Sequence, residues 1–118
     1  MLKYVVQEHI RQGADLHWDL MWEHGETLKT FRLDRPLHEI LHGPAVATPI
    51  FDHDKRFLTY EGPVNQNLGT VRIEDSGTLE VMSAEENGWD LKFNGRVLKG
   101  QFYLRQIEGN VWEFGYRH

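Results

Sequence analysis

Short runs of alternating apolar and polar residues, punctuated by glycine and asparagine, recur along the whole chain. This rhythm is typical of antiparallel β-strands joined by tight turns. It predicts strands over residues 4–10, 16–23, 27–33, 45–51, 69–74, 78–82, 89–93, 96–105 and 111–116. Asp75-Ser76-Gly77 is a turn signal between two of these strands, and Asn94-Gly95 predicts a type I′ hairpin between two others.

One short helix interrupts the strand pattern, over residues 37–41. Asp34 is suited to its N-cap and Pro36 to its first turn, while Gly43-Pro44 would end it. Many short strands and one helix in so small a chain indicate a sheet that closes on itself. We therefore expect a mainly β fold, a small closed antiparallel β-barrel with one short helix, formed by residues 1–118 as a single domain.

Composition narrows the classes of function. The chain has 118 residues, no cysteine and a formal net charge of −5. The lack of cysteine excludes disulfides, thiolate zinc sites and a cysteine nucleophile. No apolar run approaches the roughly 18 residues of a membrane span, and the first residues do not resemble a secretory signal. We expect a cytoplasmic protein without a membrane partner, and the charge argues against a wholly basic nucleic-acid coat protein.

The segment 16–23 carries the clearest chemistry. Its alternation places Leu16, Trp18, Leu20 and Trp22 on a core face, and His17, Asp19, Met21 and Glu23 on the opposite face. An imidazole and a carboxylate two residues apart on a strand can share a divalent cation. His9, on the preceding strand, would supply a third ligand. The alternative is an ordinary solvated strand face.

Further segments carry a family resemblance. They are residues 5–9, 17–23, 28–31, 51–53, 60–62, 69–71 and 98–100. Together they resemble the 3′-phosphoesterase module of bacterial DNA ligase D, over about Tyr4 to Arg105 and without a gap from His17 to Gly62. The resemblance implies a small β-barrel metalloenzyme of DNA repair by non-homologous end joining. Such an enzyme removes a 3′-phosphate or a terminal ribonucleotide, with Mn²⁺ as the favoured ion and Zn²⁺ or Co²⁺ as alternatives.

The resemblance also implies roles for individual residues. His9, His17 and Asp19 would be the metal ligands, and His53 would contact the phosphate. Arg35 stands at the position of a functional lysine. The implied partners are DNA or RNA/DNA 3′ ends, with a ligase or polymerase encoded separately, and we expect a monomer.

Three features depart from the family pattern. His9 and His17 are more widely spaced, Met21 stands in place of an arginine, and Ala45 in place of another basic residue. Met21 and Ala45 reduce the number of basic side chains that would hold a phosphate. They leave open an alternative function, that of a non-catalytic homologue serving as a metal-binding, nucleic-acid-binding or partner module.

Hairpin geometry offers a replacement for the missing arginine. A two-residue loop at His24-Gly25 would place Arg32 opposite His17, on the ligand face, and Trp18 opposite Phe31. A three-residue loop would instead place Lys29 opposite Met21. We therefore predict that Arg32 assists catalysis, together with His53 and Arg35.

Two other motifs compete with this hypothesis. The segment 38–42, His-Glu-Ile-Leu-His, matches the H-E-x-x-H pattern of zinc proteases, but its helix is short and ends at Gly43-Pro44. His17 and Asp19 with His53 would also fit the facial triad of non-haem iron enzymes. That arrangement would leave His9 without a role.

Overall fold

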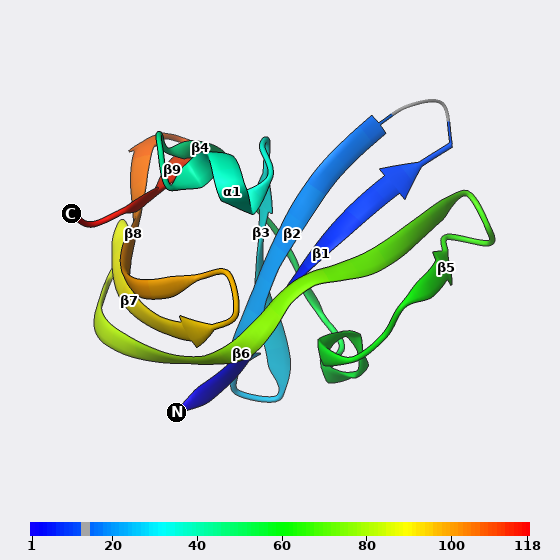
Figure 1. Ribbon diagram of the computed structural model, residues 1–118, viewed down its shortest axis with the longest axis horizontal. Coiled ribbons are helices and arrows are strands. Elements are labelled where there is room, and N and C mark those ends of the chain that lie inside the picture. Colours follow the sequence, from blue (N-terminus) through cyan, green and yellow to red (C-terminus); the bar gives the residue numbers. More distant parts are fainter. Residues whose placement is uncertain (13–14) are drawn as a thin grey trace.

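The computed structural model describes residues 1–12 and 15–118. Within these residues the strands form a single antiparallel sheet, in the order β1-β2-β3-β4-β9-β8-β7-β6-β5 (Figure 1). The strands are β1 (Leu2–Arg11), β2 (Asp15–His24), β3 (Thr27–Leu33), β4 (Ala45–His53), β5 (Gly62–Val64), β6 (Gly69–Glu85), β7 (Gly88–Gly95), β8 (Lys99–Glu108) and β9 (Val111–Tyr116). The helices are α1 (Leu37–Ile40) and a single 3₁₀ turn, η1 (Lys55–Leu58).

Pairing of β1 with β6 closes the sheet into a barrel, and β5 extends β6 outside the closed ring. The predicted mainly β barrel with one short helix is thereby confirmed. Among the described residues, no helix has the length and apolar character needed to cross a membrane.

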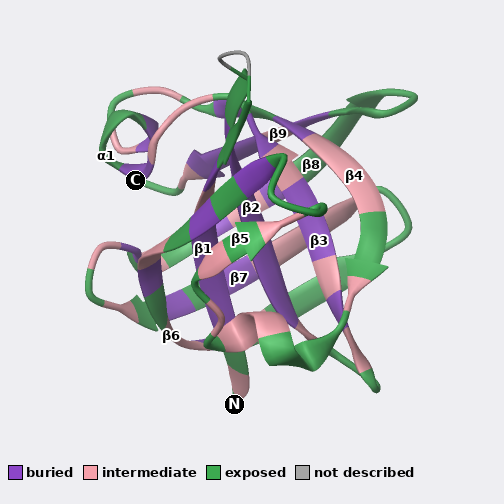
Figure 2. Ribbon diagram, turned by 90° about the vertical axis from the view of Figure 1, so that its right-hand side faces the viewer, coloured by how far each residue is buried: buried purple, intermediate pink, exposed green. Residues whose placement is uncertain are grey.

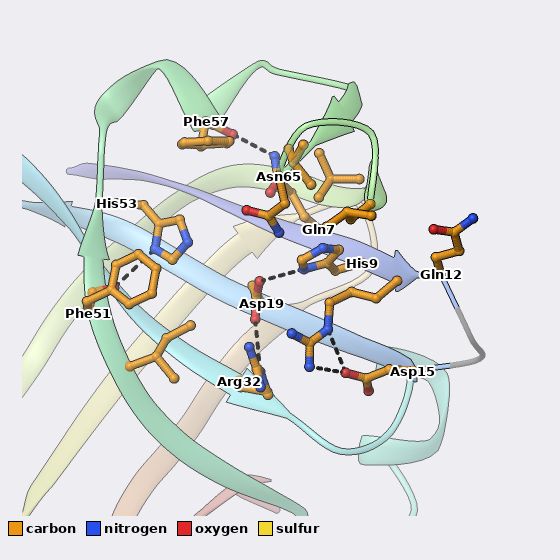
Figure 3. A pocket seen from close by; sticks show the side chains of 15 residues that line it. Gln7, His9, Gln12, Asp15, Asp19, Arg32, Phe51, His53, Phe57 and Asn65 are labelled. Carbon is orange, nitrogen blue, oxygen red and sulfur yellow. Dashed lines mark hydrogen bonds and ion pairs between the residues drawn. The ribbon is translucent and has the colours of Figure 1, made fainter.

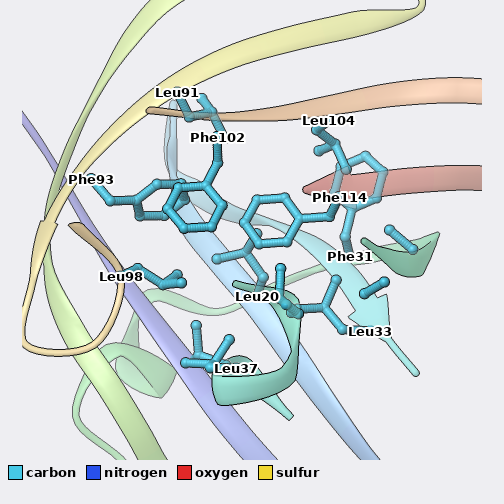
Figure 4. Packing of buried hydrophobic residues seen from close by; sticks show 14 of the residues in the cluster. Leu20, Phe31, Leu33, Leu37, Leu91, Phe93, Leu98, Phe102, Leu104 and Phe114 are labelled. Atoms are coloured by element: carbon cyan, nitrogen blue, oxygen red, sulfur yellow. The ribbon is translucent and has the colours of Figure 1, made fainter. Parts of the chain in front are cut away.

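The barrel interior holds the principal hydrophobic core, to which the core face of β2 contributes Trp18, Leu20 and Trp22 as predicted. Leu16 is the exception, with 46% of its surface exposed at the end of the strand. Aromatic rings fill the centre, where Phe102 and Phe114 stack with ring centroids 5.2 Å apart (Figure 4). Every strand of the ring contributes buried apolar side chains to this core, and their burial is the main force that holds the ring closed.

The predicted turn at Asp75-Ser76-Gly77 is wrong, because β6 continues through it as one long strand. The register of β6 against β1 shifts here, between Val6 and Gln7. Gly77 lies so close to the backbone of Asn94 that a side chain would clash with it. The glycine therefore permits close strand packing, which a sequence pattern cannot distinguish from a turn.

The predicted two-residue hairpin at Asn94-Gly95 is also wrong. Asn94 pairs with Lys99, and the Gly95 amide donates to the Leu98 carbonyl, so the connection is longer and β8 begins at Lys99. The buried Asp75 carboxylate accepts hydrogen bonds from the amides of residues 96, 97 and 98. This distant side chain stabilises a wider turn than the local sequence favours.

The short helix α1 ends one residue earlier than predicted, and Asp34 is not its N-cap. Pro36 occupies the N-cap position without a side-chain hydrogen bond, whereas Asp34 accepts one from the Val46 amide at 2.9 Å. Asp34 thus fastens the start of β4. Leu37 and Ile40 are buried and extend the core beneath the helix (Figure 4).

The β2–β3 hairpin has a two-residue loop, placed at Gly25-Glu26, where Gly25 adopts a φ of +64°. This shifts the predicted register by two residues. Trp18 pairs with Leu33 and not with Phe31, and Arg32 lies opposite Asp19 and not opposite His17. A shift of two preserves which face each side chain occupies, so Arg32 is still on the ligand face. Lys29 pairs with Trp22, which excludes the three-residue alternative.

Candidate metal centre and phosphate pocket

The outer faces of β1, β2 and β3 are covered by the segment that leaves β4 and returns through η1 and β5 (Figure 2). Gln7 anchors this segment, because its amide donates to the carbonyls of Phe57 and Tyr60, each at 3.0 Å. A second apolar cluster, formed by Val5, Met21 and Leu28, packs beneath it. Side chains on the outside of the barrel are therefore buried as well.

A group of three buried side chains lies on this covered face. His9 on β1 and His17 on β2 occupy opposite positions in the strand pair, and Asp19 follows His17 by two residues on the same face. Asp19 Oδ1 lies 3.5 Å from His17 Nε2, and Asp19 Oδ2 lies 3.8 Å from His9 Nδ1. One ligand atom from each residue falls within 4.8 Å of the others. The structure therefore brings together the three predicted metal ligands.

Several polar atoms of this group lack a hydrogen-bond partner. They are His9 Nε2, both ring nitrogens of His17, and Asp19 Oδ1. A buried polar atom without a partner costs about 1–3 kcal/mol, so such atoms are rarely left together in a folded protein. Two imidazoles and a carboxylate are a good donor set for a divalent transition-metal ion, and the group could bind one.

Charge around Asp19 favours the ionised carboxylate. Burial raises the pKa of Asp19, but the facing rings of His17 and His9 and the Arg32 guanidinium outweigh burial and lower this pKa to about 2. The carboxylate is accordingly ionised at neutral pH, which is the form that binds a metal ion.

His53 lies at the end of β4 and lines the same pocket (Figure 3). Its Nδ1 lies 3.1 Å from the Phe51 carbonyl and 2.9 Å from the Thr30 hydroxyl, which in turn donates to the Leu28 carbonyl. Because the Phe51 carbonyl can only accept, Nδ1 carries the proton and Nε2 is the free nitrogen of the neutral ring. Burial lowers the pKa of His53, although the nearby Asp19 charge opposes this.

Two arginines line the pocket. Arg32 Nε lies 4.0 Å from Asp19 Oδ1, which places the guanidinium beside one of the three potential metal ligands. Arg11 forms an ion pair with Asp15, whose Oδ1 also lies 3.8 Å from His17 Nδ1. Neither Arg11 nor Asp15 was predicted as a site residue. Their alternation with His9 and His17 places them on the ligand face and would have been sufficient to find them.

The absence of a side chain at Gly69 leaves room for the His9 ring. A Cβ atom at this position would lie 2.9 Å from His9 Nε2 and 3.3 Å from the Ile10 carbonyl oxygen. Any side chain here would displace the His9 ring. The sequence analysis noted this glycine only as part of the family resemblance.

The structure places the other candidate residues away from the pocket. Arg35 precedes α1, with Nε 3.8 Å from Asp34, and is not among the described residues that line the pocket. The two residues at basic positions of the family are buried. Met21 lies in the second apolar cluster, and Ala45 lies in the main core. A basic side chain at position 45 would point into that core. Glu23 accepts a hydrogen bond from the Lys3 amide at the opposite end of β2.

The competing metal motifs are not assembled. The side chain of His38 is 80% exposed, and α1 is too short to present His38 and His42 as a pair of ligands. Across residues 1–12 and 15–118, the only group of three potential metal ligands is the one containing His9. That group includes His9 and not His53, contrary to the facial-triad alternative.

The pocket has a volume of about 880 Å³. Its polar lining comes from His9, Asp19 and His53 together with Gln7, Arg11, Gln12, Asp15, Arg32 and Asn65. Its apolar lining comes from Ile50, Phe51, Phe57, Val64, Leu68 and Val71. The volume is far larger than a phosphate group alone requires. It falls in the range of about 300–1,000 Å³ typical of pockets for small organic ligands.

Comparison with known families agrees with this geometry. The family model described as the DNA ligase D 3′-phosphoesterase domain matches residues 7–106. This stretch includes the three potential metal ligands and His53. A search of curated proteins found no match.

Proposed function

Because the chain belongs to the DNA ligase D 3′-phosphoesterase family, we propose that it hydrolyses phosphate esters at nucleic-acid 3′ ends. The reaction would remove a 3′-phosphate or a terminal ribonucleotide during repair of DNA ends in the cytoplasm. The observation that carries this proposal is the buried group of His9, His17 and Asp19, which has unpaired polar atoms. Two of its members, His9 and Asp19, line a pocket that His53 and Arg32 also line.

The donor set fits a divalent cation, for which we propose Mn²⁺, with Zn²⁺ or Co²⁺ as substitutes. His9, His17 and Asp19 would hold the ion, which would supply a Lewis acid for the phosphoryl oxygens. Asp19 meets this requirement at neutral pH because its carboxylate is already ionised.

His53 would assist departure of the 3′ oxygen. In hydrolysis of a 3′-phosphate, a water oxygen forms a bond to phosphorus, the bond from phosphorus to O3′ breaks, and its electron pair stays on O3′. The Nε2 atom of His53 is not engaged by the contacts with Thr30 and Phe51, which hold Nδ1. When the ring takes up a second proton from solvent, at Nε2, that proton can stabilise the phosphoryl group or pass to O3′. The oxygen of the attacking water stays with the phosphate, and its protons stay there or return to solvent, which yields a 3′-hydroxyl and inorganic phosphate.

Arg32 would offset negative charge on the phosphoryl oxygens. Its guanidinium lines the pocket beside Asp19 and is partly exposed, so it can contact a ligand. Arg35 keeps its predicted catalytic role only through the family resemblance, since its ion-pair partner is Asp34 and neither residue lines the pocket.

We further propose that residues 1–118 act as one monomeric domain, alongside a ligase or polymerase encoded separately. The second candidate function is a non-catalytic module that binds metal or nucleic acid. Met21 favours this second function. It stands where the family resemblance places an arginine, and its buried thioether cannot contact a phosphate.

The decisive experiment is an assay on a primer–template that ends in a 3′-phosphate, with Mn²⁺ or with EDTA. We expect Mn²⁺-dependent release of phosphate, and loss of both Mn²⁺ binding and turnover in His17→Ala. His38→Ala is the matched control, because His38 is an exposed histidine of the competing motif. Mn²⁺ binding without turnover would favour the binding module, and loss of binding in His38→Ala would refute the assigned centre.

A further inference from the structure

We propose that Phe51 forms a stacking subsite for the base of the terminal nucleotide at a nucleic-acid 3′ end. This inference rests on the proposed function and extends it, because it assigns the apolar half of the pocket to the nucleoside. The starting observation is that 76% of the Phe51 surface is exposed while the ring lines the pocket. A large aromatic side chain that stays exposed adds little hydrophobic stabilisation to the folded state. Such side chains are a common feature of binding sites.

The ring of Phe51 is held in a defined orientation. It stacks on His53, with centroids 4.8 Å apart and an angle of 13° between the planes. The backbone carbonyl of the same residue accepts from His53 Nδ1, which fixes the two residues relative to each other. Figure 3 shows both rings at the same side of the pocket, next to Asp19. The contact with His53 covers part of the ring, and the rest is available to a ligand.

The remainder of the pocket wall suits a nucleoside better than a phosphate alone. Ile50, Val64 and Leu68 also line it, and Leu68 is itself 57% exposed. Phosphate oxygens form no favourable contact with such side chains, whereas a base and a sugar do. The same pocket is lined by Arg32 and by two of the three potential metal ligands, His9 and Asp19, which would face the charged end of the ligand.

Proximity identifies which nucleotide would occupy the subsite. Phe51 is stacked on the histidine that we assign to the phosphate, so a base on Phe51 would belong to the nucleotide bearing that phosphate. Stacking on an aromatic ring tolerates all four bases, because every base has a π-face. We therefore expect a preference for a base-bearing terminus without a preference for its identity.

The test compares two primer–templates that end in a 3′-phosphate, one with a normal terminal nucleotide and one with an abasic terminal sugar. The wild-type protein should show a KM about 10- to 100-fold lower for the base-bearing terminus, as expected for loss of one stacked base. Phe51→Ala should abolish this difference, whereas Phe51→Trp should retain it. Ile107→Ala, which removes an exposed apolar side chain from β8, should behave as the wild type.

Two outcomes would overturn the inference. One is an equal loss of kcat for both termini in Phe51→Ala, which would show that Phe51 only positions His53. The other is an unchanged preference in Phe51→Ala, which would leave the exposed ring to a protein partner or to another role.

A second measurement separates this inference from the proposed function. An oligonucleotide with 2-aminopurine at its 3′-phosphorylated end is titrated with protein in EDTA, and the fluorescence of the base is followed. Quenching by the wild type that is lost in Phe51→Ala and kept in Phe51→Trp supports the subsite, even if no hydrolysis occurs. Equal quenching by the wild type and Phe51→Ala refutes the subsite, even if hydrolysis does occur.

Discussion

Asp75 and Asp19 are both buried aspartates, but their surroundings differ in kind. Asp75 accepts four hydrogen bonds, from the amides of residues 96, 97 and 98 at 2.9–3.1 Å and from the Tyr4 hydroxyl at 2.7 Å. Asp19 faces two imidazoles at 3.5 and 3.8 Å and a guanidinium at 4.0 Å, and its Oδ1 has no hydrogen-bond partner. One carboxylate completes a turn, whereas the other has an oxygen that no hydrogen bond of the protein engages.

The contrast shows how burial should be interpreted. A buried charge whose every oxygen is engaged by the protein contributes to the fold. A buried charge that faces only other unpaired groups, in a pocket, is suited to bind something else. Both aspartates are equally inaccessible, so burial alone does not separate the two cases; the state of their hydrogen bonds does.

The largest expected effect is on stability at the turn. Asp75→Ala would leave three backbone amides and the Tyr4 hydroxyl without their acceptor, and should lower the free energy of unfolding by about 3–5 kcal/mol. Asp19→Ala should cost at most about 2.5 kcal/mol, the value that corresponds to lowering its pKa to about 2. Urea unfolding at pH 7 in EDTA measures both. Equal losses would remove the distinction between the two aspartates.

The second apolar cluster, which contains Met21, gives a second test. Met21 is fully buried with Val5 and Leu28 beneath η1, so Met21→Arg would bury a charge that has no partner. We expect a loss of about 3 kcal/mol or more in the free energy of unfolding, and no gain in activity. Met21→Leu, which conserves volume, is the control. A stable and more active Met21→Arg protein would show that position 21 opens toward the pocket.

Arg32 tests whether the region around Asp19 is built to receive an anion. A charge-assisted contact with phosphate is worth about 1.5–3 kcal/mol, so Arg32→Ala should reduce kcat/KM on a 3′-phosphate by about 10- to 100-fold. Arg72→Ala is the control, because Arg72 pairs with Glu8 and is not among the residues that line the pocket. Equal activity of the two variants would exclude Arg32 from phosphate binding.

A substitution at Gly69 tests whether the potential metal ligand His9 needs the space that this glycine leaves. Gly69→Ala would place a methyl group 2.9 Å from His9 Nε2, and the displaced ring should weaken Mn²⁺ binding by about tenfold. Gly88→Ala provides a comparison, because its added Cβ would make only an ordinary 3.6 Å contact with the Leu104 carbonyl. Titration calorimetry with Mn²⁺ measures the difference. An unchanged affinity would mean that the His9 ring moves without cost.

The smallest expected effect concerns protonation of His53. Burial lowers its pKa, so at pH 7 the ring is mainly neutral and must gain a proton to bind an anion well. The affinity for sulfate in EDTA should therefore rise as the pH falls from 7.5 to 5.5, by about 3- to 10-fold. Sulfate is suitable because its own charge is constant over this range. His53→Gln should show a weaker pH dependence than the wild type, and identical profiles would exclude His53 from the anion site.

Much of the site was predictable from short segments. In β2 the alternation placed His17 and Asp19 on one face, with Trp18 and Leu20 on the other, because the side-chain period of a strand is a property of its own backbone. Arg32 was placed on the correct face for the same reason. The predicted cross-strand partner of Arg32 was wrong by two positions. Alternation along a strand determines the face that a residue occupies, but it does not determine where the hairpin loop lies.

Features that depend on distant segments could not be predicted in this way. Asp75 looked like part of a turn, yet it stabilises another turn some twenty residues later, which only the folded barrel brings within reach. The burial of Met21 requires η1 to fold over the outside of the barrel. Neither contact leaves a local pattern, because the residues involved are far apart in the chain.

The sequence by itself determined the class of fold, the faces of β2 and of Arg32 on β3, and the three potential metal ligands, because these follow from strand periodicity and residue chemistry. The tertiary structure decided which polar groups are satisfied and which are not. Closure of β1 onto β6 places Gly69 against His9, and the return through η1 and β5 encloses the pocket beside Phe51 and His53. Desolvation and hydrogen bonding depend on every neighbour of an atom, and most neighbours of these atoms come from other strands.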